Sequence, residues 1–85
     1  MDPRMAAFES GNGMLKQGKI ADAVRELKKA VKANPEYADG HFFLAAAYAA
    51  SGEDAYACTE LQKYVALAPG GRYAAQAKTN IANCR

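Results

Sequence analysis

Apolar residues recur along this chain at helical spacing and stop at glycine or proline. Residues 16–37, KQGKIADAVRELKKAVKANPEY, read as a lysine-rich amphipathic helix that ends at Pro35. Proline cannot continue a helix because it lacks the amide donor, whereas glycine accepts the positive φ of a tight turn. The pattern therefore predicts helices separated by short turns.

The same pattern returns after 34 residues. An ungapped shift by 34 positions gives nine identities: Phe8 and Phe42, Gly18 and Gly52, Ala21 and Ala55, Ala23 and Ala57, Glu26 and Glu60, Leu27 and Leu61, Lys29 and Lys63, Val31 and Val65, and Pro35 and Pro69. Each copy contains a helical stretch, a glycine turn, a second helical stretch and a proline. Each copy is therefore predicted to be a hairpin of two helices.

A period of this length with this punctuation resembles the tetratricopeptide repeat. In the first copy, roughly residues 4–37, the matching positions are Gly11, Gly18, Ala23, Leu27, Ala30 and Pro35. In the second copy, roughly residues 38–71, they are Leu44, Ala45, Tyr48, Gly52, Ala57, Leu61 and Pro69. The resemblance implies an all-α fold, a short right-handed α-solenoid of five helices, as one domain over residues 1–85.

The last segment, RYAAQAKTNIANCR at residues 72–85, is predicted to be a capping helix. One side of it is apolar and the other polar, as a helix that covers the last hairpin requires; the apolar stripe is Ala74, Ala77, Ile81 and Cys84. Tyr64 stands where the family has a small residue against the following helix. We therefore expect the last helix to be displaced or rotated.

Composition and charge narrow the function classes. Twenty alanines against three valines and two isoleucines leave little material for strands. The net charge of +2 comes from interleaved acids and bases, so no dense basic face for nucleic acid is expected. The sequence shows neither the apolar run of a signal peptide nor a membrane span, and it predicts a soluble chain of cytoplasm or periplasm.

Catalytic and metal-binding chemistry find little support in the sequence. The chain has one histidine, two cysteines and carboxylates without catalytic spacing, which predicts a protein that is not an enzyme. His41 lies where a helix faces its hairpin partner, and we expect a packed or half-exposed imidazole rather than a metal ligand. No cofactor is expected.

The two cysteines allow two interpretations. Cys58, early in one predicted helix, and Cys84, late in the next, lie at the same end of an antiparallel pair, so a disulfide is geometrically possible. Alternatively, they are two small buried apolar side chains. A disulfide would indicate an oxidising compartment such as a periplasm.

The resemblance also implies a concave groove lined by the first helix of each hairpin. Carried over to this chain, the groove positions are Met5, Phe8, Asn12 and Leu15, then Asp39, Phe42, Ala46 and Ala49, and finally Tyr73, Gln76 and Asn80. Among them we expect peptide contacts from Phe8, Asn12, Leu15, Phe42, Tyr73, Gln76 and Asn80, with the two phenylalanines as anchors. The alternative is that both phenylalanines simply pack the inner helices together.

Two functions remain open from the sequence. The first is an adaptor or scaffold module that binds an apolar or amphipathic segment of a partner protein in this groove. The second is a self-association module that forms homo-oligomers through the N-terminal side, where no capping helix is recognised.

Overall fold

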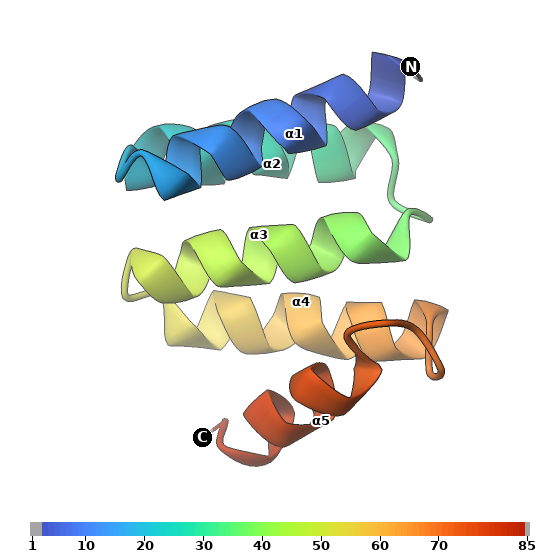
Figure 1. The fold of residues 1–85 in the computed structure, drawn as a ribbon. Coiled ribbons are helices and arrows are strands. Elements are labelled where there is room, and N and C mark those ends of the chain that lie inside the picture. Colours follow the sequence, from blue (N-terminus) through green and yellow to red (C-terminus); the bar gives the residue numbers. More distant parts are fainter. Residues whose placement is uncertain (1–2, 85) are drawn as a thin grey trace.

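The computed structural model describes residues 3–84, and this part of the chain is a stack of five helices without strands. The helices are α1 (Pro3–Lys16), α2 (Ile20–Ala33), α3 (Ala38–Ala50), α4 (Asp54–Leu67) and α5 (Ala74–Ala82). Each helix packs mainly on the next one in the chain, so that two antiparallel hairpins lie side by side and α5 covers the second (Figure 1). The predicted all-α fold of helix hairpins is confirmed.

The two hairpins close in the same way at their glycine turns. Gly18 and Gly52 have φ angles of 80° and 82°, a conformation in which a side chain would be strained. The N–H of the next residue then bonds back to the helix that has just ended, from Lys19 to the Met14 carbonyl and from Glu53 to the Tyr48 carbonyl, each at 2.9 Å. The glycines that punctuate the sequence thus set the hairpin turns.

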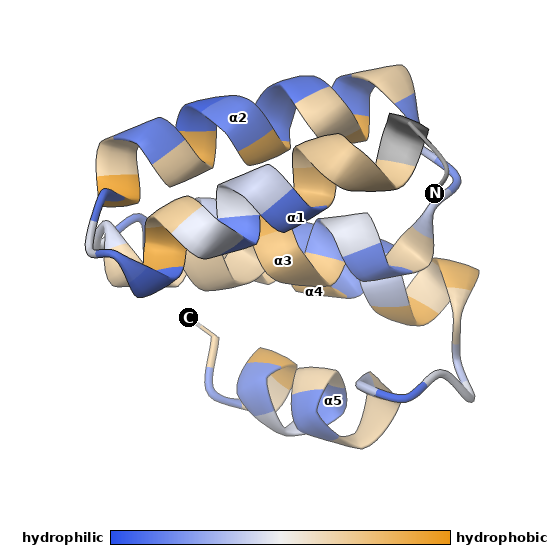
Figure 2. Ribbon diagram, turned by 45° about the horizontal axis from the view of Figure 1, so that its top comes forward, coloured by the Kyte–Doolittle hydropathy of each residue, from blue (hydrophilic) through white to orange (hydrophobic). Residues whose placement is uncertain are grey.

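Small residues lie where helices approach most closely. Ala23 is fully buried and Ala57 is 5% exposed, which suits positions where two helices pack closely. A side chain at Gly11 on α1 would collide with the fully buried Leu27 on α2. Figure 2 shows the complementary pattern, with hydrophilic residues along the outer side of α2. Half of the buried apolar residues are alanine, and the other half are larger side chains that fill the space between the helices.

The last helix is shorter than the sequence predicts and is positioned by Tyr64. Helix α5 begins at Ala74 rather than near residue 72 and ends at Ala82. The Tyr64 side chain is fully buried, and its hydroxyl accepts a hydrogen bond of 2.9 Å from the backbone N–H of Tyr73. Gly71 lies against this hydroxyl, and a side chain there would collide with it. A large residue at position 64 therefore fixes where the chain turns into α5.

Candidate functional site: a groove between α3, α4 and α5

A groove of about 710 Å³ lies between the second hairpin and α5. Three helices contribute to it, and its lining residues are Phe42, Ala45, Ala46 and Ala49 on α3, Asp54, Ala55, Ala57, Cys58 and Leu61 on α4, and Gln76, Asn80, Asn83 and Cys84 on α5 and just beyond it. The volume falls in the range of small-ligand and peptide pockets. Most of the lining is apolar, and five of these thirteen residues are alanine.

The groove runs along the helices. Phe42 and Ala49 are separated by two turns of α3, which is about 10 Å along the helix axis. Because α4 runs antiparallel to α3, Leu61 lies at the Phe42 end and Asp54 at the Ala49 end. The groove therefore has an aromatic end and an acidic end.

At the aromatic end, ring stacking holds α5 to α3. The rings of Phe42 and Tyr73 are stacked, with centroids 4.2 Å apart and planes inclined by 4°. Tyr64 packs against both rings, at 5.7 Å from Phe42 and 6.1 Å from Tyr73. The Arg72 guanidinium carbon lies 5.9 Å from the centre of the Tyr73 ring, which adds a cation–π contact. This end of the groove is consequently well packed.

The polar groups of the groove lie on α5 and at the start of α4. Gln76, Asn80 and Asn83 are spaced by four and three residues, so their amides form one stripe along the α5 wall. Asn83 donates to the Thr79 carbonyl at 3.1 Å. Asp54 is the one charged side chain among the lining residues, and no lysine or arginine is among them. The groove thus presents amides and a single negative charge.

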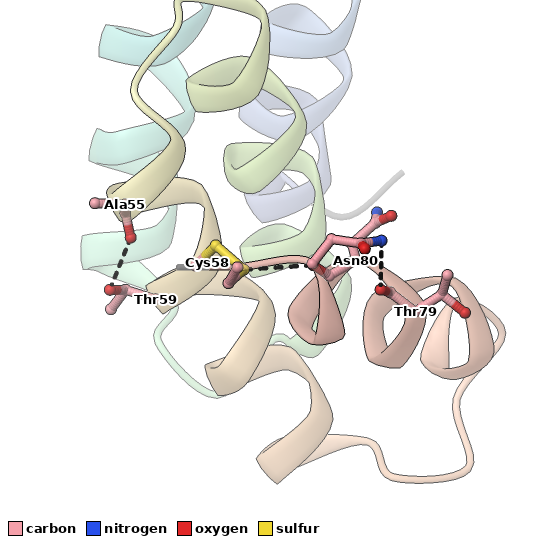
Figure 3. The surroundings of a disulfide bond; sticks show 7 residues. Ala55, Cys58, Thr59, Thr79 and Asn80 are labelled. Carbon is pink, nitrogen blue, oxygen red and sulfur yellow. Dashed lines mark hydrogen bonds between the residues drawn. A yellow bond between two sulfur atoms is a disulfide. The ribbon is translucent and has the colours of Figure 1, made fainter.

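A disulfide between Cys58 and Cys84 forms part of the groove wall. The Cα atoms of the two cysteines are 6.2 Å apart, within the range that a disulfide spans. Figure 3 shows the bond between α4 and the segment after α5, with Asn80 beside it. Of the two interpretations of these cysteines, the structure therefore has the bridge, and both residues are half-buried rather than fully buried.

Comparison with known protein families gives a match to the tetratricopeptide repeat over residues 8–72. This match spans most of the chain and includes both helix hairpins apart from the start of α1. The chain belongs to the tetratricopeptide repeat family. Comparison with curated proteins gives no match. Members of this family are generally modules for protein–protein interaction, so the tetratricopeptide repeat fold indicates a protein partner.

The groove of this tetratricopeptide repeat protein contains part of the predicted peptide site. Phe42, Gln76 and Asn80 line it, and Tyr73 stacks on Phe42 beside it. Asn12 and Leu15 lie on α1, half-buried and outside the lining residues.

Phe8 requires a correction, because it cannot be an exposed anchor in this structure. Its side chain is 2% exposed, and its ring centroid lies 4.8 Å from that of Tyr37 and 6.5 Å from that of Phe43. Gly40 provides the space, since a side chain there would collide with the Phe8 ring. For Phe8, the packing alternative is therefore the correct one.

Sequence reasoning missed the contribution of α4. Asp54, Ala55, Ala57 and Leu61 line the groove, although the repeat resemblance places the ligand surface on the first helix of each hairpin. Asn83 was also missed, although its spacing from Gln76 and Asn80 follows the same helical stripe. The helical spacing on α5 could have identified Asn83, whereas the α4 residues depend on how α5 is placed.

Outside the groove, His41 and Glu60 form a buried pair between α3 and α4. His41 Nδ1 lies 2.8 Å from a Glu60 carboxylate oxygen, and His41 Nε2 lies 2.7 Å from the Pro35 carbonyl, to which it donates. Lys63 donates to the other Glu60 oxygen at 3.2 Å. Burial, with an added contribution from the nearby Glu60, raises the pKa of Tyr48 above its usual value. Of the two environments expected for His41, packed or half-exposed, the structure has the packed one.

Two further features concern metals and membranes. Across residues 3–84 no three histidine, cysteine or acidic side chains gather in a way that could hold a metal ion. Within the same part of this tetratricopeptide repeat chain, no helix has both the length and the apolar character needed to cross a membrane.

Proposed function

We propose that this tetratricopeptide repeat protein is a non-catalytic adaptor that binds a short apolar segment of a partner protein, carrying one lysine or arginine, in the groove between α3, α4 and α5. The observation that carries the proposal is the lining of this groove, an apolar wall and floor with a single charged residue, Asp54, at one end. The shape and the charge of the groove each restrict the ligand.

The length of the groove restricts the ligand to a short segment. About 10 Å of groove accommodates roughly three residues of an extended chain or two turns of a helix. Exposed Ala46, Ala49 and Ala55 leave room for the ligand's apolar side chains, while buried Ala45 and Ala57 lie deeper in the floor. A few apolar side chains would therefore supply most of the binding free energy.

Charge and hydrogen bonding orient the segment. A cation at one end of the ligand would lie beside Asp54, whereas an acidic residue there would be repelled. The amides of Gln76 and Asn80 each offer a donor and an acceptor along the α5 wall, as the N–H and C=O groups of a peptide backbone require. The apolar groups of the groove would thus provide the affinity, and its polar groups would fix the direction in which the segment binds.

Selection from a library of random peptides displayed on phage tests the proposal. We expect enrichment of sequences in which a few large apolar residues adjoin one lysine or arginine. The variant Ala46→Arg places a long cationic side chain in the groove, and Ala66→Arg is its matched control because Ala66 is exposed on α4 outside the lining. Enrichment should be lost with Ala46→Arg and kept with Ala66→Arg.

The charge preference has its own variant. Asp54→Asn keeps the size of the side chain and removes its charge, so the enriched peptides should retain their apolar residues and lose the preference for a cation. Equal enrichment by the wild type and by Ala46→Arg would contradict the proposal.

Sedimentation at rising protein concentration, in the same preparations, tests the alternative function, which is self-association into homo-oligomers.

A further inference from the structure

The two ends of α5 are held by different means. At its N-terminal end, Tyr73 stacks on Phe42 and its backbone N–H donates to the Tyr64 hydroxyl, and Ala74 and Ala77 are buried. Beyond Ala77, residues 78–80, 82 and 83 are exposed, and Ile81 is half-buried. The C-terminal end is joined to α4 by the disulfide of Cys84 with Cys58.

That disulfide also determines the position of one groove wall. Asn80, in the exposed half of α5, and Asn83, just beyond the helix, line the same groove as the two cysteines. A helix of nine residues does not persist without tertiary contacts, because isolated helices this short are marginal in water. Without the covalent link, the second half of α5 would be tied down mainly by Ile81.

The disulfide is also within reach of a reductant. Both cysteines are half-buried, and both line a groove that is open to solvent. Exchange begins when a thiolate reaches one of the two sulfur atoms, so access decides whether it occurs. A segment bound in the groove would cover the same two residues.

We propose that the Cys58–Cys84 disulfide is a redox clasp that holds the groove in its binding form, an inference that rests on the function proposed above. In the reduction step a dithiol gives two electrons and two protons to the S–S bond. The bond breaks, Cys58 and Cys84 become thiols, and the dithiol becomes a disulfide. The second half of α5 then frays, the amide wall is lost and ligand affinity falls.

Linkage makes this relation reciprocal. If reduction lowers the affinity for the ligand, bound ligand must disfavour reduction by the same factor. A bound segment would also slow reduction by covering the disulfide. The disulfide therefore couples two measurable quantities, the affinity of the groove for its ligand and the tendency of the disulfide to be reduced by a dithiol.

Hydrogen exchange tests the clasp without any ligand. After treatment with dithiothreitol, we expect the amides of residues 80–84 to lose protection while those of α1 and α2 keep theirs. The control is the double variant Cys58→Ala, Cys84→Ala, which should show the fast exchange with and without the dithiol. Unchanged protection in α5 after reduction would overturn the proposal, and so would global loss of helical circular dichroism, which would make the disulfide a support for the whole fold.

Binding supplies the second measurement, with the most enriched peptide from the phage selection as the probe. Its affinity should fall by about tenfold when the wild-type protein is reduced and recover when it is reoxidised. Equal affinity in both states, with α5 frayed, would overturn the clasp and leave the proposed function standing. Absence of binding to the oxidised protein would instead contradict the proposed function, and the exchange result would still decide whether the disulfide holds α5.

Discussion

The two junctions between successive helical units are built on the same repeat but differ in how they are filled. At the first junction the α1–α2 hairpin meets α3, and at the second the α3–α4 hairpin meets α5. In the first copy of the repeat, Leu15, Ile20 and Val24 are half-buried. The corresponding positions in the second copy, 34 residues later, are Ala49, Asp54 and Cys58, and all three line the groove. The groove therefore arises where the second copy has smaller or polar side chains.

The equivalent phenylalanines show the same difference. Phe8 is buried against Tyr37 and over Gly40. The positions corresponding to Tyr37 and Gly40 are Gly71 and Ala74, so the second junction offers neither that ring nor that space. Phe42 consequently remains half-buried, stacks on Tyr73 and lines the groove. A repeat can thus keep a residue and change its role by changing the residues around it.

The largest expected effect concerns these two phenylalanines. Phe8→Ala should lower the free energy of unfolding by about 3 to 5 kcal/mol, because a fully buried aromatic side chain leaves a cavity. Phe42→Ala should cost about half as much, since its ring is partly exposed, and should also weaken peptide binding. Urea denaturation measures both. Equal losses of stability would show that the two junctions are packed alike.

The next largest effect on stability is expected at Glu60, in comparison with Glu26 at the equivalent position of the first copy. Glu60 is buried against His41, whereas the residue corresponding to His41 in the first copy is Ala7. Glu60→Ala should lower the free energy of unfolding by about 3 kcal/mol, because it leaves a buried imidazole without its partner. Glu26→Ala should cost under about 1 kcal/mol. Denaturation of the two variants gives the comparison, and a small effect at Glu60 would contradict it.

Removal of the disulfide should have an effect of similar size on stability. The cysteines are 26 residues apart, and closing a loop of this length contributes about 3.5 kcal/mol through the entropy of the unfolded chain. Cys84→Ser should therefore lower the denaturation midpoint while leaving helical circular dichroism below the transition nearly intact. If the Cys84→Ser protein is instead unfolded, the stability of the second junction depends on the disulfide far more than we expect.

The smallest effect on stability is expected for a substitution that gives the second junction a residue of the first. Ala49→Leu introduces the side chain found at Leu15, and because Ala49 is exposed the free energy of unfolding should change by under about 0.5 kcal/mol. The added side chain fills the groove, so binding of the selected peptide should weaken by about tenfold, or about 1.4 kcal/mol. Fluorescence anisotropy with a labelled peptide measures this, and unchanged affinity would place the ligand elsewhere.

Much of the fold follows from local sequence features. Glycines with positive φ and the prolines after α2 and α4 mark the hairpins, and small residues such as Ala23 and Ala57 mark the crossings. These features act within one or two helical turns, so the pattern alone is sufficient to predict them. The start of α5 was harder to predict because it depends on the Tyr64 hydroxyl, which bonds to a residue nine positions away.

The candidate site was only partly predictable. The repeat resemblance placed Phe42, Gln76 and Asn80 on the inner helices, and the structure brings them to the groove. It could not show that Gly40 makes room for Phe8, because that contact joins α1 to the start of α3. Nor could it show that α4 lines the groove, because this depends on where Tyr64 and the disulfide hold α5.

NMR titration of the uniformly ¹⁵N-labelled, oxidised protein with the most enriched peptide shows whether the second junction binds the ligand. We expect the largest shifts of backbone amide signals at the groove residues Ala46, Ala49, Ala55 and Asn80, while the signals of α1 and α2 change little. Shifts concentrated on Asn12, Leu15 and the rest of the first hairpin would contradict this expectation.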